Sequence, residues 1–486
     1  MSKNWSVQQQ AIFSWVQDGE GNAIVDAVAG SGKTTTIIEC SKRIPAGSSY
    51  VFLAFNRSIV EELTAKGIEA RTFHSIGFGP TIKAINGDKK ATSKTYKIAS
   101  NILGEDDMKA YGQAIIKLVS LAKSNGIGCI QPDEYTFWRN IAEYHNVADD
   151  IVGDGSISEV IRYSQKVLQL SNASKAFDFD DMLYIPLMRN LSLPKFDFIF
   201  VDEAQDTNVM RRAFIRKMCK PHTRIIAVGD AAQSIYGFTG ADNDSLNIIA
   251  QEFNCQRFPL STTYRCAASI VEHAQQYNNV IQARPDAPQG IVRTIPDGWD
   301  HTIFAQSDLV LCRNTAPLIE LVWKLIKARV PAFVKGKDIG AGLESLIKKM
   351  KAKGIDALIE KLAAYREREV TAATNANKLY KVGLINDKVD SILYLIDTLS
   401  ENDRTVPALC DLIKTLFKDF GQGVQLSTIH KAKGLEAENV FWLNAGLCPS
   451  KYATQDWMMQ QEQNLQYVAA TRAKSTLSYI EQAKAD

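Results

Sequence analysis

The chain has 486 residues, which is too long for one hydrophobic core and predicts two to four domains. Its 45% hydrophobic and 23% charged residues are ordinary for a globular protein, and its net charge of +2 neither supports nor excludes a nucleic-acid partner. The scattered cysteines form no Cys-x-x-Cys pair, and no apolar run reaches the roughly 20 residues of a membrane helix. No secretory signal opens the chain, so we expect a soluble, cytoplasmic protein without a zinc site or a disulfide framework.

The first informative motif lies between a predicted strand at 22–29 and a predicted helix that starts near Thr35. Gly30 and Gly32 occupy the turn between them, where missing side chains let backbone N–H groups approach an anion. Lys33 can then reach the outer phosphates of a nucleoside triphosphate, and the Thr34 hydroxyl can bind Mg²⁺.

Ala27 takes the place of the glycine that usually opens this phosphate-binding pattern. A glycine-rich turn that binds nothing is the weaker alternative, because strand, loop and helix all fall where a phosphate cradle needs them. We therefore predict a nucleoside triphosphate site, which by itself does not say how the energy is used.

Strand-like apolar runs alternate with helical stretches along the chain, which predicts parallel sheets covered by helices. Two long helical stretches, about 80–175 and 343–420, interrupt the alternation, and we interpret them as insertions into two α/β cores. The lysines at 348, 349, 351 and 353 are more typical of a solvated helix face than of a binding patch. The predicted strands are 50–55, 196–201, 224–228, 308–312, 424–429, 439–443 and 476–480.

The apolar run that begins at Phe198 ends in two carboxylates, Asp202 and Glu203. At the carboxyl end of a strand beside the phosphate loop, Asp202 can hold Mg²⁺ and Glu203 can act as the general base for the attacking water. An acidic cap at the start of a helix is the alternative, and the pairing with the phosphate loop favours the catalytic interpretation.

A further loop follows a strand that ends at Asp230. Gln233 is placed there to sense the γ-phosphate. Tyr236 and Phe238 stand two residues apart, and aromatic side chains on a loop can stack on bases. Burial of both aromatics in the core is the alternative, because it is the commoner environment of such residues.

Together these motifs resemble the superfamily 1 DNA helicases, specifically the UvrD/Rep/PcrA-like branch. The matches run in the order of the family over almost the whole chain. Besides the segments above, they are Ser6–Ile12, Leu53–Ser58, Arg71–Ser75, Phe179–Leu183, Leu260–Arg265, Val310–Thr315, Leu426–Glu436 and Gln466–Lys474.

The resemblance implies an α/β fold with two RecA-like parallel-sheet cores, each carrying a mainly helical insertion. It places the first core at 1–80 and 176–255 with its insertion at 81–175. The second core is expected at 256–342 and 421–486, with a short insertion at 343–420.

The resemblance also implies roles for individual residues. Gln9 and Tyr264 would contact adenine, Glu436 the ribose, Arg265 the γ-phosphate, and Arg472 would be the arginine finger. The expected nucleotide contacts are Gln9, Ala27, Val28, Ala29, Gly30, Ser31, Gly32, Lys33, Thr34, Thr35, Tyr264, Arg265, Glu436 and Arg472. The expected DNA contacts are Phe55, Asn56, Arg57, Thr72, His74, Tyr236, Phe238, Thr428 and His430.

The chain departs from the family pattern at two places. Where the family usually carries Trp followed by Arg, this chain has Phe238 and Thr239, which keeps a stacking platform and loses an arginine contact. The aromatic residue beside Asn56 is shifted by one position, which weakens the assignment of Phe55. The residues of the motifs around Asn56 and His74 resemble those of the F-box-helicase-like subgroup.

The resemblance therefore implies an ATP- and Mg²⁺-dependent DNA helicase that moves along single-stranded DNA, 3′→5′, in repair, recombination or replication. Its expected partners are single strands and junctions with duplex, and no membrane. A translocase that remodels nucleoprotein complexes with little unwinding is the main alternative. A nucleic-acid-binding scaffold with an ATPase switch, and an RNA substrate, also stay open.

Overall fold

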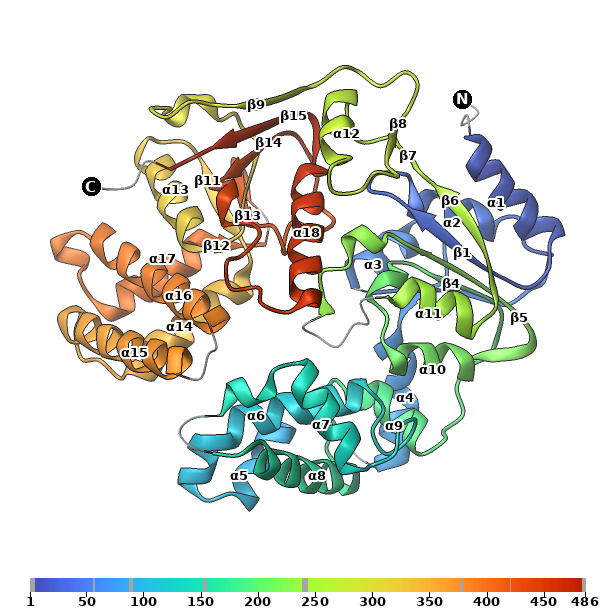
Figure 1. Cartoon of the computed structure of the whole chain (residues 1–486), viewed down its shortest axis with the longest axis horizontal. Coiled ribbons are helices and arrows are strands. Elements are labelled where there is room, and N and C mark those ends of the chain that lie inside the picture. Colours follow the sequence, from blue (N-terminus) through green and yellow to red (C-terminus); the bar gives the residue numbers. More distant parts are fainter. Residues whose placement is uncertain are drawn as a thin grey trace. The chain divides into compact units, whose positions relative to one another are not determined.

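The computed structural model describes residues 5–55, 57–86, 91–151, 155–237, 244–375, 379–419 and 421–482. The chain folds as two compact units. The first comprises Met1–Val28 and Gly32–Ser261, and the second comprises Ala29–Ser31 and Thr262–Asp486. Each unit is built on a parallel sheet covered by helices (Figure 1), which confirms the predicted fold class.

The sheet of the first unit has the strand order β3-β2-β4-β5-β1-β6 among the described residues. Every pair of neighbouring strands is parallel. Strands that run parallel must be joined by crossovers, and helices supply them here. The strands are β1 (Asn22–Ala27), β2 (Tyr50–Ala54), β3 (Ala70–Thr72), β4 (Phe196–Val201), β5 (Cys219–Gly229) and β6 (Cys255–Leu260).

The central strands of this sheet are apolar on both faces. In β4, Phe198 and Phe200 pack into one hydrophobic cluster, whereas Ile199 and Val201 pack into another. Successive side chains of a strand point to opposite faces, so a strand with helices on both sides is a continuous apolar run. This is why the run at 196–201 could be predicted as a buried strand.

The helices of the first unit include a group inserted between β3 and β4. Helices α5, α6, α7 and α8 lie together beside α4 and α9 (Figure 1). Their core is continuous with α9 and α10, since Trp138 and Leu118 share one buried cluster with Tyr184 and Met210. The helices are α1 (Val7–Asp18), α2 (Lys33–Ser41), α3 (Arg57–Ala65), α4 (Phe73–Ile85), α5 (Lys94–Ile102), α6 (Glu105–Ser124), α7 (Tyr135–Tyr144), α8 (Ile157–Ala173), α9 (Asp181–Met188), α10 (Val209–Lys217) and α11 (Ser245–Glu252).

The main sheet of the second unit has the order β12-β11-β13-β10-β14-β15-β9, again with parallel pairs. A small sheet pairs β7 with β8. The strands are β7 (Thr262–Thr263), β8 (Gln282–Ala283), β9 (Ile291–Thr294), β10 (Leu309–Cys312), β11 (Ala332–Lys335), β12 (Phe417–Lys418), β13 (Val424–Thr428), β14 (Ala437–Leu443) and β15 (Ala473–Ile480).

The helical insertion of the second unit shares its core with the sheet. Val310 of β10 and Leu426 of β13 lie in the same buried cluster as Leu358 of α15 and Leu395 of α16. Asp387 of α16 also accepts backbone hydrogen bonds from Thr315 and Ala316 at 3.0 and 2.8 Å, which caps the start of α13. The helices of this unit are α12 (Ala268–Ala274), α13 (Ala316–Lys327), α14 (Lys337–Met350), α15 (Ile355–Asn375), α16 (Leu379–Thr398), α17 (Val406–Leu416) and α18 (Asp456–Ala470).

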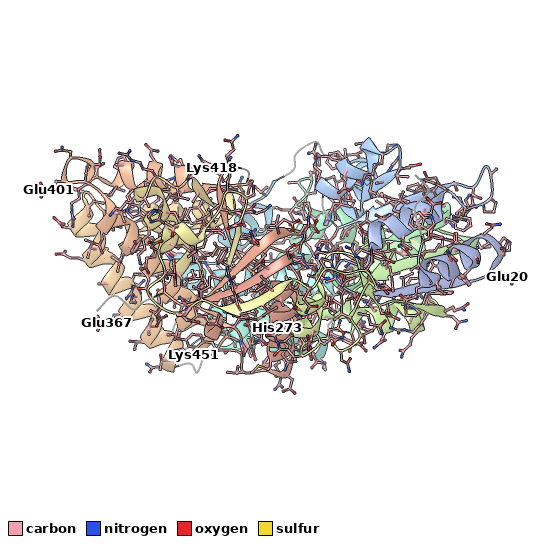
Figure 2. The ribbon with its side chains drawn as sticks, turned by 90° about the horizontal axis from the view of Figure 1, so that it is seen from above. Glu20, His273, Glu367, Glu401, Lys418 and Lys451 are labelled. Carbon is pink, nitrogen blue, oxygen red and sulfur yellow. The ribbon has the colours of Figure 1, made fainter. Side chains whose placement is uncertain are left out.

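The insertion meets solvent through charged side chains. Figure 2 labels Glu367 on α15, Glu401 just after α16 and Lys418 in the edge strand β12. Glu401 and Lys418 are exposed. Within the described ranges, none of the helices combines the length and apolarity that crossing a membrane requires.

Strand β6 lies at the border between the two compact units. The sequence analysis expected the first core to end at 255; β6 pairs along its length with β1, and the first compact unit continues to Ser261. Several positions of β6 are exposed, and the strand contains Pro259, so its sequence has no continuous apolar run that would predict a strand.

Candidate nucleotide site and nucleic-acid interface

The predicted phosphate loop connects β1, which ends at Ala27, to α2, which begins at Lys33. Gly30 and Gly32 have φ values of 69° and 80°, in the left-handed region that glycine adopts without a steric penalty. No side chain caps the first turn of α2 among the described residues. Its N–H groups are therefore available to an anion, which the helix dipole also favours. Of the other predicted loop contacts, Ala27, Val28, Ala29 and Ser31 are buried and Thr35 is half-buried.

Lys33 is the first side chain of this site. Its ammonium nitrogen is buried without a hydrogen-bond partner among the described residues, and it lies 3.6 Å from Oε1 of Glu203. A buried ammonium group normally needs strong acceptors. The site thus holds an incompletely satisfied cation beside the amides of the loop, which fits the phosphates of a nucleoside triphosphate.

Thr34 and Asp202 form the second part of the site. The Thr34 hydroxyl donates to Oδ2 of Asp202 at 3.2 Å, and the backbone N–H of Glu203 donates to Oδ1 at 2.9 Å. Burial, together with the neighbouring carboxylate of Glu203, raises the pKa of Asp202 to about 6. A hydroxyl and a buried carboxylate are oxygen ligands of the kind that Mg²⁺ prefers, so the donor set fits this ion.

Glu203 has a strained backbone. Its φ of 49° places it in the left-handed region, which costs a non-glycine residue about 1–3 kcal/mol that surrounding contacts have to offset. Its backbone donates to Asp202 and accepts from the N–H of Asp206 at 3.0 Å. The side chain of Gln205 orients the Glu203 carboxylate, because its Nε2 donates to Glu203 Oε2 at 2.5 Å while its Oε1 accepts from the N–H of Asp230 at 3.0 Å. The sequence analysis missed Gln205, although it stands within the acidic run that ends at Asp206.

Gln233 lies close to this group in the first unit. Its side-chain amide donates to Oδ2 of Asp230 at 2.7 Å, and the residue is buried. Glu203, Gln205, Asp230 and Gln233 therefore form a continuous hydrogen-bonded series between the ends of β4 and β5. The sequence placed Gln233 at the site without indicating this connection.

Gln9 serves as a capping residue at the start of α1. Its Oε1 accepts from the N–H of Ser6 at 3.0 Å while the Ser6 hydroxyl accepts from the N–H of Gln9 at 3.1 Å, which is a reciprocal capping box. Its Nε2 donates to the hydroxyl of Thr36 in α2 at 3.0 Å. The predicted adenine reader is thereby anchored to the helix of the phosphate loop.

The remaining predicted nucleotide residues belong to the second unit. Arg265 donates from Nε to Oε2 of Glu436 at 2.7 Å and from Nη1 to the carbonyl of Thr471 at 3.1 Å. Lys474 also contacts Glu436, at 2.9 Å, and these cations hold the pKa of this carboxyl below its usual value despite partial burial. Tyr264 precedes Arg265 and exposes 40% of its surface.

Arg472 adjoins this group and is buried, at 1% exposure. Its guanidinium donates to the carbonyls of Val468 and Leu435 at 3.0 and 3.2 Å, and to the hydroxyl of Thr471 at 3.4 Å. A role as arginine finger therefore requires a rearrangement that brings the buried guanidinium into contact with a phosphate oxygen. The sequence motif did not indicate this internal bonding.

The predicted DNA-contacting residues of the first unit divide into two groups. Thr72 caps α4 by accepting from the N–H of Ser75 at 3.1 Å, and the His74 ring stacks on Phe179 with centroids 3.7 Å apart and planes 21° apart. Phe179 is 52% exposed. The sequence analysis quoted Phe179 as part of a motif but did not assign it a role.

The second group surrounds Phe55. The Phe55 ring stacks on Tyr236 with centroids 6.1 Å apart, and the Arg211 guanidinium lies 4.2 Å from its centroid. Phe55 and Tyr236 are both half-buried. Arg57, by contrast, is exposed and pairs with Glu61 at 3.0 Å, whereas Asn56 and Phe238 lie outside the described residues.

The predicted DNA contacts of the second unit follow β13. Thr428 ends this strand, and its hydroxyl accepts from the N–H of Lys431 at 3.4 Å. His430 lies two residues further on, where burial and the charges of Arg313 and Lys431 lower the pKa of its imidazole to about 3. Its ring is therefore neutral at physiological pH.

Comparison with known proteins agrees with this architecture. Residues 39–254 match the UvrD/REP helicase N-terminal domain, and residues 344–484 match the UvrD-like helicase C-terminal domain. Together the two matches cover more than half of the chain. Two RecA-like units with a phosphate loop define the class, and the chain belongs to the UvrD/Rep family of superfamily 1 helicases, whose members use ATP.

Several individual proteins are similar over long stretches. F-box DNA helicase protein 1 of Schizosaccharomyces pombe is 23% identical over 93% of this chain and 55% of its own length. Gabija protein GajB of Bacillus cereus is 24% identical over 96% of this chain and 94% of its own length. The ATP-dependent DNA helicase PcrA of Leuconostoc citreum is 25% identical over 54% of this chain and 38% of its own length. The chain thus spans about half or less of the F-box and PcrA relatives and nearly all of GajB.

Proposed function

We propose that this protein is an ATP-dependent DNA helicase or translocase that moves along single-stranded DNA in the 3′→5′ direction. One observation carries the proposal: the buried Lys33 ammonium lies at a glycine-rich loop, 3.6 Å from the Glu203 carboxylate, in a chain of the UvrD/Rep family. A cation, a base and a free helix N-terminus converge where a γ-phosphate has to be bound and attacked.

The site residues of the first unit have different roles in the proposed ATP hydrolysis. Lys33 and the loop amides would bind the phosphates, and Thr34 and Asp202 would hold Mg²⁺. The bound ion would neutralise charge on the phosphate oxygens. Glu203 accepts a proton from the attacking water, and Gln205 keeps its carboxylate aimed by the bond at 2.5 Å.

The second unit supplies the complementary groups in this proposal. Arg265 and Arg472 stabilise negative charge on the γ-phosphate, Glu436 binds the ribose and Tyr264 stacks on adenine. An arginine that acts on the transferred phosphate contributes about 10³–10⁵ in rate. In our proposal the cycle of ATP binding and hydrolysis alternates the grip of the protein on the strand.

Single-stranded DNA is the proposed track, and its junction with duplex is the proposed working site. The exposed ring of Phe179, stacked on the half-buried His74, suits base faces, and the backbone groups near Thr72, Thr428 and His430 suit phosphates. The direction rests on membership of the family. Repair, recombination and replication are the proposed settings.

The test combines two assays. ATP hydrolysis is measured with and without single-stranded DNA, and strand displacement is measured on duplexes with a 3′ or a 5′ tail. We expect stimulation by single strands, weakening by salt, and displacement from the 3′ tail. Strong stimulation without displacement would favour remodelling of nucleoprotein complexes, and no stimulation would refute the proposal.

A further inference from the structure

A tight turn precedes α9 in the first unit. The N–H of Asp178 donates to Oδ2 of Asp181 at 2.9 Å, and the N–H of Asp181 donates to Oδ1 of Asp178 at 3.0 Å. These two reciprocal bonds close the four residues from Asp178 to Asp181 into one rigid loop. Phe179 is the second residue of this loop.

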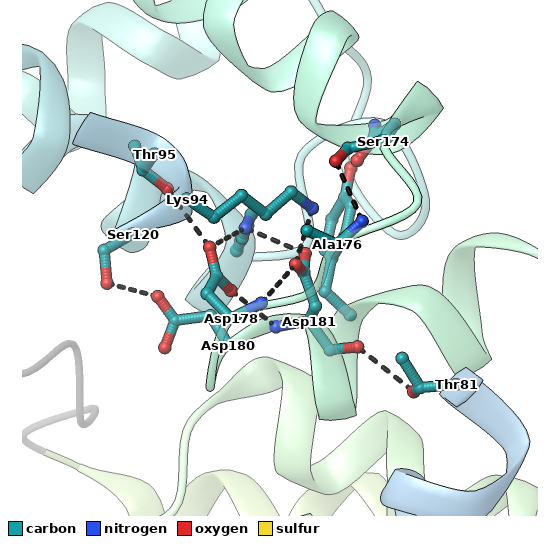
Figure 3. A network of polar contacts seen from close by, with 12 residues as sticks. Thr81, Lys94, Thr95, Ser120, Ser174, Ala176, Asp178, Asp180 and Asp181 are labelled. Carbon is teal, nitrogen blue, oxygen red and sulfur yellow. Dashed lines mark hydrogen bonds and ion pairs between the residues drawn. The ribbon is translucent and has the colours of Figure 1, made fainter. Parts of the chain in front are cut away.

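Side chains from the helical insertion bind the aspartates of the turn (Figure 3). Lys123 of α6 contacts Asp178 and Asp181, both at 2.8 Å, and Lys94 of α5 donates to Asp181 at 2.7 Å. Ser120 of α6 donates to Asp180 at 2.6 Å, and Thr95 of α5 donates to Asp178 at 3.1 Å. Every acidic side chain of the turn therefore has a partner in the insertion.

Lysine is unusual at such depth. Lys94 and Lys123 are 3% and 1% exposed, and Asp181 is fully buried. Well-packed apolar residues commonly stabilise a fold as well as a buried ion pair does, so stability alone is a weak reason for this network. Ion pairs with several bonds do impose one geometry on the groups that they join.

The geometry imposed here concerns Phe179. Its neighbours Asp178 and Asp180 are held inward by Lys123 and Ser120, whereas Phe179 itself remains 52% exposed and stacks on His74 at 3.7 Å. His74 belongs to the first turn of α4, outside the ionic network. The insertion thus binds the two residues that flank Phe179, and the Phe179 ring lies against a residue of the core.

We propose that Lys94 and Lys123 are positioning residues, by which the helical insertion holds Phe179 against His74 as a platform for a base of single-stranded DNA. This inference rests on the proposed function, since it names a device that serves the same DNA-binding surface. The lysines themselves contact no base and act only through the turn.

The first experiment measures the turn directly in the full chain. Hydrogen–deuterium exchange is followed at the amides of Asp178 and Asp181 in wild type, Lys123→Met and the control Lys97→Met, whose exposed lysine lies on α5 beside Lys94. Exchange should accelerate in Lys123→Met only. Unchanged protection would overturn the inference, and this readout needs neither ATP nor DNA.

The second experiment is a double-mutant cycle on binding of a fluorescent oligothymidine. Lys123→Met and Phe179→Leu should each weaken binding about tenfold, the loss expected for one stacked base, and the double variant should also lose about tenfold. A hundredfold loss would show that Lys123 acts independently of Phe179, and would overturn the inference.

Ser120→Ala and Thr95→Val provide milder variants in case Lys123→Met fails to fold. Each removes one hydrogen bond from a hydroxyl to an aspartate of the turn. Each should weaken oligothymidine binding in part, and should weaken it no further when Phe179 is already replaced by Leu. Additive losses would count against the inference. If wild type does not bind the oligonucleotide at all, the proposed function fails, while the exchange experiment still decides whether Lys123 holds the turn.

Discussion

Lys33→Met is the sharpest test of the nucleotide site. The Lys33 nitrogen stands 3.6 Å from Glu203, in side chains that are only 11% and 21% exposed. At an effective dielectric constant of about 20, the gross attraction at this distance is about 4–5 kcal/mol. The same charge would act on the γ-phosphate, so its loss removes a major part of the electrostatic stabilisation of the transition state.

The expected loss of turnover is about 10²–10³-fold, or about 3–4 kcal/mol in the barrier, as for other preorganised electrostatic groups. The residual activity should also move to higher pH, because Lys33 lowers the pKa of Asp202 and its removal lets that pKa rise above about 6. Methionine keeps the length of the side chain, so packing of the loop is little disturbed.

The assay is steady-state phosphate release with and without single-stranded DNA, across pH 5 to 9, roughly two units either side of neutrality. Lys42→Met is the matched control, because Lys42 follows the same helix with 62% of its side chain exposed and pairs with Glu39. Turnover of Lys33→Met within a few-fold of wild type would refute the placement of phosphates at Lys33.

Further predictions concern Asp202, Arg472 and the core of the second unit. Burial and Glu203 raise the pKa of Asp202 to about 6, so its carboxylate takes up a proton as pH falls below that value. The apparent Mg²⁺ affinity should therefore drop about tenfold per pH unit below 6. An Mg²⁺ affinity that does not change from pH 7 to 5 would contradict this. The same shift works against folding at higher pH: the apo protein should lose this group's favourable contribution as pH rises from about 4 through 6. Arg472→Ala should leave nucleotide binding largely intact while turnover falls about 10³-fold or more, and an equal loss of both would mean that Arg472 only supports α18 through its bonds to carbonyls. Leu395→Ala should lower the free energy of unfolding by about 2–4 kcal/mol in chemical denaturation, because Leu395 is fully buried, whereas Leu384→Ala on the same helix, at 53% exposure, should change it by less than about 0.5 kcal/mol.

The central strands could be predicted because their chemistry is local. A strand such as Ile199-Phe200-Val201 is buried on both faces, so its apolar run is visible without knowledge of any neighbour. The edge strands could not be predicted in this way. β9 (Ile291–Thr294) is exposed at every residue except the half-buried Val292, and β3 has only three residues, so neither leaves a continuous apolar run.

The assignment of residues to the nucleotide site stays a prediction from the motifs, and the hydrogen bonds that these residues form could not be predicted. The loop glycines, Lys33, Asp202 and Glu203 form a motif whose spacing follows from the geometry of phosphate binding. The bond from Gln205 to Asp230, and the burial of Arg472, depend on contacts between distant segments that leave no periodic trace. Lys123 is the clearest case, since a lysine on a helix indicates solvent unless its buried acidic partners are known.

The shared core of the second unit limits how this chain can be engineered. Leu358 and Leu395, from the helices between β11 and β12, fill the same apolar layer as Val310 and Leu426 from the strands. Excising those helices would uncover that layer, so the segment cannot be exchanged like a surface loop. We expect the helical insertion and the sheet to unfold in one cooperative transition. An insertion taken from a relative would therefore need the strand residues that face it in that relative.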